Sequence, residues 1–157
     1  MGSPNVHYIA IGTELLNGHR LNTNAQYLGR VLAAQLGLSL SEIQAIPDDP
    51  PRLIEAINNS RADVVITSGG LGPTEDDKTT EAICSLLKCG MAFHQDSITQ
   101  IKTALASRGE AVIKTAILQA RYPKKPKACL NPVGLAPAFY FDHGGNKEMS
   151  LPGAPQE

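Results

Sequence analysis

A buried strand followed at once by a glycine-rich turn, in segment 62–78 (ADVVITSGGLGPTEDDK), is the feature that most constrains this chain. The apolar run 64–66 is closed by glycines and a proline, which is typical of a central strand in a parallel sheet. Three glycines within positions 69–72 predict a loop that takes positive φ or approaches a ligand closely. The next helix is expected to begin near Lys78, so its free N–H groups favour an anion at the same place.

The segments before and after this turn alternate between strand-like and helix-like patterns. Apolar runs at 6–11 and 38–46 predict strands, and Thr23 with Gln26 resembles a capping box. Helices are predicted over 23–36, from Asp49 (N-cap) and Pro50 onward, over 78–88 and over 96–107. This order predicts an α/β fold, a doubly wound and mostly parallel sheet with helices on both faces, as a single domain over 1–157.

The last third of the chain gives weaker patterns. Residues 112–118 fit either a strand or a short helix, and 122–127 are expected to form a Pro- and Lys-rich loop. Two late strands are predicted at 138–141 and 148–151, joined by a turn that contains Gly144 and Gly145.

Composition limits the classes of function. The formal net charge is −1, so the chain lacks the basic excess that neutralises nucleic-acid phosphates or an anionic membrane. No apolar segment has the length of a membrane span and no signal peptide is recognised, so a cytoplasmic protein is expected. Three cysteines without CxxC spacing argue against a disulfide framework or a zinc site, and Cys84 is expected to be a core thiol.

Acidic residues follow each of the first three predicted strands. Glu14 follows the first, Asp48 and Asp49 the second, and Asp76 and Asp77 the third. Because parallel strands bring their carboxyl ends to one edge, these carboxylates are expected to share a site. Close like charges require a cation or raised pKa values, and hard oxygen ligands suit magnesium or manganese held jointly with phosphates. Asp49 and Asp77 begin helices, so N-capping is the alternative role for these two.

The glycine turn matches neither of the two common nucleotide fingerprints. It lacks the GxxxxGK[ST] of a P-loop, and GGLGPT has the wrong spacing for a dinucleotide-binding fold. The residues alone therefore predict a phosphate-bearing ligand with a divalent metal and leave the reaction open.

Three motifs together resemble the molybdopterin-binding (MoaB/Mog-like) domain family, most closely the N-terminal domain of CinA-type proteins. They are GTELLNGHRLNTN (12–24), the Pro-Asp-Asp turn (47–49) and TSGGLGPTEDD (67–77), supported by NPVGLAP (131–137) and LPGAP (151–155). The resemblance covers nearly the whole chain. It implies a three-layer α/β/α fold that is commonly homo-oligomeric.

The resemblance also implies two chemistries. Some CinA-type domains hydrolyse ADP-ribose to AMP and ribose 5-phosphate with a divalent metal such as magnesium, manganese or cobalt. Related domains adenylylate molybdopterin during synthesis of the molybdenum cofactor. A non-catalytic nucleotide-binding or oligomerisation module is the third hypothesis, so the expected partner is a nucleotide or pterin.

Carried onto this sequence, the resemblance implies catalytic and metal-binding roles for Asp48, Asp76 and Asp77. It implies that the glycine turn binds phosphate or ribose and that segments near 131–134 and 152–153 form a second wall. The ligand-binding residues implied in this way are Gly12, Glu14, Asn24, Ser68, Gly69, Gly70, Gly72, Thr74, Lys114, Asn131, Gly134, Pro152 and Gly153.

The chain departs from the family pattern at three places. Ala138 stands where the family usually has glycine, and KTAILQ (114–119) replaces a K-x-A-x-x-P run. The sequence stops at Glu157, where relatives continue, so a fragment of a longer protein is expected. The nicotinamide-nucleotide amidase activity of the larger C-terminal portion of CinA is therefore not assigned to it.

Overall fold

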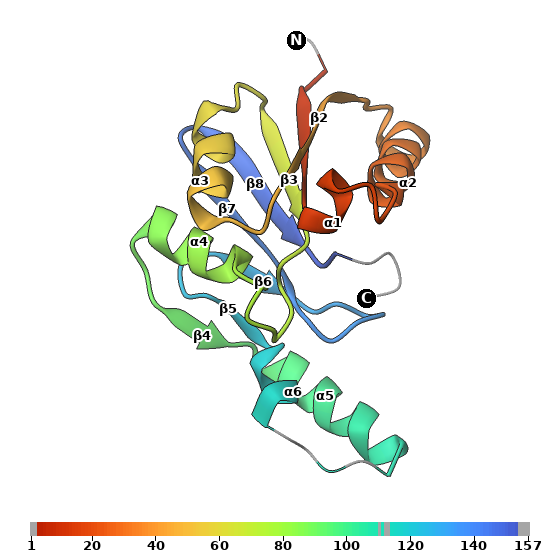
Figure 1. Ribbon diagram of the computed structural model, residues 1–157, viewed down its shortest axis with the longest axis vertical. Helices are drawn as coiled ribbons and strands as arrows, with labels where there is room; N and C mark the ends of the chain where they lie inside the picture. Colours follow the sequence, from red (N-terminus) through yellow and green to blue (C-terminus); the bar gives the residue numbers. More distant parts are fainter. Residues whose placement is uncertain (1–2, 110, 112–113, 154–157) are drawn as a thin grey trace.

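The computed structural model describes residues 3–109, 111 and 114–153. Its main sheet has six strands in the order β2-β1-β3-β8-β7-β6 (Figure 1). The strands are β1 (Val6–Ile11), β2 (Leu40–Ile46), β3 (Val64–Ser68), β6 (Lys127–Cys129), β7 (Ala138–His143) and β8 (Asn146–Leu151). β1, β2, β3 and β8 are parallel, whereas β7 runs antiparallel to both of its neighbours. The predicted mostly parallel α/β sheet is confirmed.

Helices cover both faces of this sheet, as predicted. α2 (Thr23–Val31) continues into the π-helical turn η1 (Leu32–Leu36) on one face, and α3 (Pro50–Asn59) and α4 (Thr79–Leu87) cover the other (Figure 1). The short α1 (Thr13–Leu16) precedes α2. Successive residues of β1 alternate between the two cores: Tyr8 packs with the α2 cluster and Ile9 with the α3 and α4 cluster. All six residues of β1 are buried, as expected of a central parallel strand.

The two late strands form the predicted hairpin. Gly144 and Gly145 connect β7 to β8 with φ values of 60° and 92°, a left-handed pair that glycine adopts without steric cost. β8 then pairs in parallel with β3, so the segment that follows β8 reaches the same edge as the glycine turn. This crossing brings Pro152 and Gly153 beside the strand ends that carry the acidic residues.

A separate unit extends from one end of the sheet (Figure 1). It contains α5 (Gln95–Ser107), α6 (Lys114–Leu118) and a two-stranded sheet of β4 (Met91–Phe93) and β5 (Arg121–Pro123). Its small core consists of Ile101, Ala116 and Ala120. The loop predicted for 122–127 is confirmed only for 124–126, because β5 and β6 occupy its two ends. Each of these strands has three residues, too few for an alternating pattern to show. The part of 112–118 that the structure describes is helical.

Three helix starts differ in detail from the predictions. The N-cap of α2 is Asn22, whose side chain accepts from the Ala25 N–H at 3.1 Å, so the capping box that begins at Thr23 was wrong. Asp49 occupies the N-cap position of α3, with Pro50 following, but its side chain makes no capping hydrogen bond. Lys78, not Asp77, is the N-cap residue of α4.

Cys84 and Glu148 are ionisable residues that are buried in the core. Burial raises the pKa of Cys84 to about 11, which fits the expected core thiol. Burial also raises the pKa of Glu148 to about 8; this residue is 2% exposed, and neither carboxylate oxygen has a hydrogen-bond partner in the described part of the chain.

Among the described residues, no helix combines the length and the apolar character needed to span a membrane.

Candidate ligand-binding groove

A groove of about 1610 Å³ opens at the carboxyl ends of β1, β2 and β3. Its first wall, called here the glycine-loop wall, comes from the segments that follow these strands. It consists of Thr13, Glu14, Leu15, the 19–24 segment, Asp48 and residues of 69–77. Its second wall, called the α5 wall, consists of Gln100, Ala104, Leu105, Arg108, Gln119, Val133, Gly134, Leu135 and Ala136. Tyr8, Ala10, Ser68, Pro152 and Gly153 also line the groove.

Asp48 joins the segments that follow β1 and β2. Its Oδ2 accepts a hydrogen bond from the Thr13 N–H at 2.8 Å and another from the Thr13 hydroxyl at 3.0 Å. The carboxylate therefore holds the start of α1 against the β2–α3 turn. Only Oδ2 takes part in these bonds, so Oδ1 remains able to face a ligand.

Asp77 has the same arrangement within its own turn. Its Oδ2 accepts from the Thr74 N–H at 2.8 Å and from the Thr74 hydroxyl. A Cβ added to Gly72 would lie 2.6 Å from this oxygen, so Gly72 leaves the space that the carboxylate occupies. Asp77 shapes the turn instead of capping α4. Asp76, next to it, is exposed and also lines the groove.

Two glycines allow the turn to pass close to its neighbours. Gly69 has φ +108°, and a Cβ there would overlap the Ile11 carbonyl oxygen. Gly70 has φ +67°, and a Cβ there would overlap the Thr79 hydroxyl, which donates to the Gly69 carbonyl at 2.8 Å. Both positions combine left-handed backbone with close packing, so each requires glycine.

The groove also has a buried polar floor. The hydroxyls of Tyr8 and Ser68 are 2.5 Å apart, and both residues are buried. Burial raises the pKa of Tyr8, while hydrogen bonds to Ser68 and Asn24 oppose that shift. The Asn24 side-chain amide donates to the Gly153 carbonyl. One polar chain thus connects β1, β3, α2 and the segment after β8.

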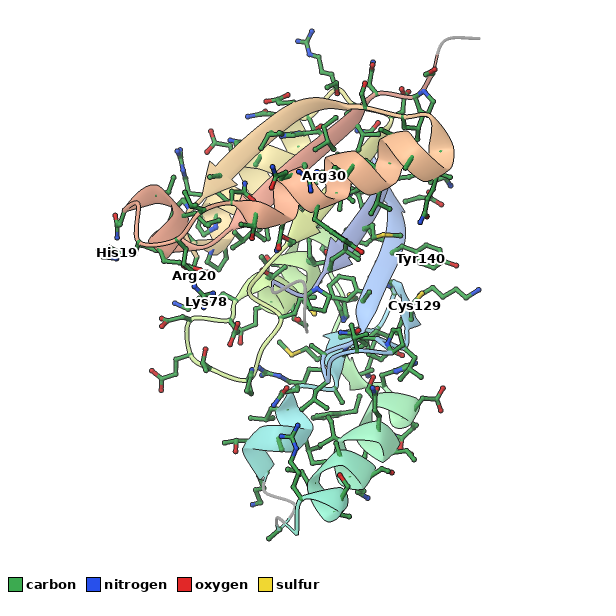
Figure 2. The ribbon with its side chains drawn as sticks, turned by 90° about the vertical axis from the view of Figure 1, so that its right-hand side faces the viewer. His19, Arg20, Arg30, Lys78, Cys129 and Tyr140 are labelled. Atoms are coloured by element: carbon green, nitrogen blue, oxygen red, sulfur yellow. The ribbon has the colours of Figure 1, made fainter. Side chains whose placement is uncertain are left out.

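Basic side chains complete the electrostatics of the groove. His19 and Arg20 lie on the glycine-loop wall, and Arg108 lies on the α5 wall. Figure 2 shows His19, Arg20 and Lys78 on one side of the molecule, away from Tyr140 and Cys129. Carboxylates and cations therefore face the same space, which suits a ligand that carries phosphates and polar hydroxyls.

The structure brings most of the predicted site residues to this groove. Of the predicted residues, Glu14, Asn24, Asp48, Ser68, Gly69, Gly70, Gly72, Thr74, Asp76, Asp77, Gly134, Pro152 and Gly153 line it. Gly12, Lys114 and Asn131 do not.

These three residues have other surroundings. Gly12 is buried, its N–H donates to the Ile46 carbonyl at 3.0 Å, and a Cβ there would meet the Glu14 carboxylate at 2.8 Å. Lys114 is exposed at the first residue of α6. Asn131 is buried behind the wall, where its Oδ1 accepts from the Val133 N–H at 3.1 Å.

Sequence reasoning missed most of the α5 wall. The apolar periodicity of α5 predicted a helix, but nothing in it indicated which face borders a ligand. Tyr8 was also missed, since a tyrosine within a buried strand reads as core. Thr13 and Arg20 carried a weak signal, because both lie in the long segment after the first strand.

The acidic residues fit a metal ion only in part. Among the described residues, no group of three or more His, Cys, Asp or Glu side chains is assembled that could hold a metal ion. The predicted Asp48, Asp76 and Asp77 cage is therefore not preformed, because Asp48 and Asp77 each turn one oxygen toward a threonine. Hard oxygens on one groove still suit a magnesium-like ion that takes its remaining ligands from water and phosphate.

Comparisons with known proteins agree with this geometry. Residues 7–157 match the model of a family described as a probable molybdopterin binding domain. A CinA-like protein of Dictyoglomus thermophilum is 38% identical over 151 residues, which are 95% of this chain and 36% of that protein. A protein of Caldivirga maquilingensis is 37% identical over 153 residues, which are 96% of this chain and 59% of that protein. The chain thus spans between about one third and three fifths of the length of these relatives.

Solved structures give the same assignment. The crystal structure of CinA, of unknown function, from Thermoplasma acidophilum has a TM-score of 0.81 and 31% identity, with 99% of this chain and 91% of that chain covered. The molybdopterin biosynthesis enzyme MoaB from Thermus thermophilus has a TM-score of 0.61 at 20% identity, covering 98% and 83% of the two chains, and shows the shared fold alone. The chain belongs to the probable molybdopterin-binding domain family, with CinA-like proteins among its relatives.

Proposed function

We propose that the groove binds a nucleotide by its phosphates and that the chain hydrolyses the phosphoanhydride bond of ADP-ribose or a similar dinucleotide. The supporting observation is that the glycine turn and the acids after three parallel strands line a single groove. Backbone amides suit phosphate oxygens, and carboxylates beside them suit a cation or an attacking water. The products would be AMP and ribose 5-phosphate.

The residues of the glycine-loop wall have separate roles in phosphate binding, proton transfer and ion binding. The amides of residues 70–72 donate to phosphate oxygens, since the Gly69 N–H already donates to the Leu151 carbonyl, and Arg20 adds positive charge. Asp76, exposed and beside the turn, accepts the proton of the water whose oxygen attacks phosphorus, while the bridging oxygen leaves with the other phosphate. The free oxygens of Asp48 and Asp77 would hold a divalent ion together with the phosphates. Such an ion supplies charge neutralisation and lowers the pKa of bound water.

Turnover of ADP-ribose tests this proposal. The protein is incubated with ADP-ribose and magnesium, manganese or cobalt, and AMP is quantified. Asp76→Asn is expected to lower kcat by at least about 100-fold with little change in ligand affinity, because the general base is lost. Glu75→Gln is the matched control, since Glu75 is the exposed acidic neighbour outside the groove lining. Absence of AMP with all three metals contradicts the proposal.

A second candidate is molybdopterin binding with adenylyl transfer. Two findings favour it: the description of the matched family and the shared fold with MoaB. It uses the same phosphate and metal chemistry, so the glycine-loop wall does not separate it from hydrolysis. Parallel titrations with molybdopterin and ADP-ribose discriminate the two, because only the true ligand is expected to bind tightly. Unchanged nucleotide binding in Asp76→Asn, with no turnover in the wild type, favours the non-catalytic module instead.

We further propose that the chain forms a homo-oligomer. Tyr140 and Met149 are cross-strand neighbours on β7 and β8 and are 39% and 38% exposed. Light scattering of the purified chain tests this, with a mass of a single copy as the contradicting result.

A further inference from the structure

The two walls of the groove differ in charge. The glycine-loop wall carries four carboxylates (Glu14, Asp48, Asp76 and Asp77) and Arg20, whereas the described residues of the α5 wall carry one ionised side chain, Arg108. The remaining surface of the α5 wall is formed by small and apolar side chains and two glutamine amides. A phosphate with its metal therefore belongs on the first wall, and an uncharged part of the ligand belongs on the second.

The shape of α5 indicates what that part is. Gln100, Ala104 and Arg108 are spaced four residues apart, so they share one face of the helix. The ends of this row are about 12 Å apart along the axis. Because the Ala104 side chain is short, the row is expected to be lowest at its middle, and this place is called the depression; Leu105 lines the groove beside it and packs against the core of the unit.

The polar groups around the depression match a flat heterocycle. The Arg108 guanidinium stacks well on planar rings, and the Gln119 amide offers both a donor and an acceptor to a ring edge. Gln100 has a different role: its amide donates to the Asn131 carbonyl at 2.9 Å and ties α5 to the 131–136 loop. Val133, which is 68% exposed, provides apolar surface from that loop.

We infer that the α5 wall is the subsite for the planar nitrogen heterocycle of the ligand, with Ala104 under the ring and Arg108 and Gln119 at its border. This inference rests on the proposed function, because it takes the phosphates to lie on the glycine-loop wall. Adenine and a pterin share the relevant chemistry: flat apolar faces and an edge of ring nitrogens and amino groups.

Filling the depression tests the inference. Ala104→Leu places a branched side chain where the ring would lie, and Ala106→Leu is the matched control on an exposed position of the same helix. Binding of AMP, a pterin monophosphate and ribose 5-phosphate is measured by calorimetry with each protein in the presence of magnesium. Thermal unfolding of each variant confirms that the fold is retained.

The expected result is at least a tenfold loss of affinity for AMP or for the pterin monophosphate in Ala104→Leu, with ribose 5-phosphate unchanged and Ala106→Leu like the wild type. The ligand whose affinity falls shows whether the subsite binds adenine or a pterin ring. Arg108→Gln, an exposed substitution that is tolerated by the fold even where Ala104→Leu is not, is expected to weaken the same ligand by about three- to tenfold.

Three results overturn the inference: unchanged affinity for both rings in both α5 variants, an equal loss for ribose 5-phosphate, or no binding of either ring by the wild-type chain. The proposed hydrolysis is judged separately by AMP release from ADP-ribose. If the wild type releases no AMP but Ala104→Leu weakens ring binding, the hydrolysis fails and the subsite stands. If AMP is released and no α5 variant changes ring affinity, the subsite fails and the hydrolysis stands.

Discussion

The two walls of the groove are built in different ways. The glycine-loop wall is held together by hydrogen bonds between the segments that follow the strands, such as the Thr13 N–H to Asp48 at 2.8 Å and the Thr79 hydroxyl to the Gly69 carbonyl at 2.8 Å. The α5 wall combines a satellite unit, whose core contains Ile101, Ala116 and Ala120, with the 131–136 loop, and the Gln100–Asn131 bond joins the two. The first wall is thus built on one sheet, whereas the second joins two parts of the molecule.

The largest effect is expected from Gly69→Ala. Its Cβ would overlap the Ile11 carbonyl, and φ +108° strains any residue with a side chain. Overpacking and strain together are expected to cost about 4 kcal/mol of unfolding free energy and to abolish nucleotide binding. Urea unfolding and calorimetry measure the two losses.

Gly37→Ala is the control for Gly69→Ala. Gly37 has a similar left-handed φ of +64° but nothing within 4 Å of an added Cβ, so only about 1 kcal/mol is expected. Equal losses for the two variants would show that packing against β1 does not define the glycine-loop wall.

The independence of the walls is tested by Ile101→Ala. Ile101 is fully buried in the satellite core, so its truncation is expected to destabilise that unit by about 3 kcal/mol. Hydrogen exchange should show faster exchange in α5 with unchanged protection in β1 and β3. Equal acceleration in the central strands would mean that both walls share one cooperative unit.

The pH dependence of the unfolding free energy is expected to arise from the core. Glu148 is a buried acid outside both walls, and its pKa of about 8 in the folded chain lies above the ordinary value of 4.5. The folded state thus binds the extra proton, so stability from this group is complete below pH 4.5 and is lost as pH rises toward 8. The expected loss is roughly 2–3 kcal/mol of unfolding free energy between pH 4.5 and pH 7.

Glu148→Gln removes this titration and should flatten the profile of unfolding free energy against pH. Glu75→Gln, at an exposed position of the glycine turn, should leave the profile unchanged. If the wild-type slope persists in Glu148→Gln, a group other than this core acid sets the pH dependence.

The smallest effect is expected from Tyr8→Phe, which removes the phenolic hydroxyl that lies 2.5 Å from the Ser68 hydroxyl. The ring volume is kept, so the loss should be about 1 kcal/mol of stability. Nucleotide affinity should fall by about fivefold, because the loss of a single hydrogen bond leaves Ser68 less well oriented beside Gly69. An unchanged affinity, with stability reduced, would restrict Tyr8 to a structural role.

The sequence predicts the glycine-loop wall far better than the α5 wall, and the reason is physical. Continuous apolar runs predict strands β1, β2 and β3. Because these strands are parallel, the acidic residues that follow them lie at one edge of the sheet, whatever the conformation of their side chains. Asp48 and Asp76 were expected on a shared rim, and both line the groove.

Contacts between distant segments were not predictable in this way. The bond from Gln100 to Asn131 and the pairing of Met91 with Pro123 depend on how a satellite unit folds back, which no local pattern encodes. The three-residue strands β4, β5 and β6 are too short to show periodicity. The hydrogen bond from Thr13 to Asp48, 35 residues apart, is likewise set by tertiary packing.

A crystal structure of the chain soaked with ADP-ribose and magnesium tests the central claim most directly, because it locates the phosphates relative to the two walls. We expect phosphate oxygens within hydrogen-bond distance of the backbone amides of residues 70–72, with the ion beside Asp48, Asp76 or Asp77. Phosphates bound away from the glycine turn, or ligand found only outside this groove, would contradict it.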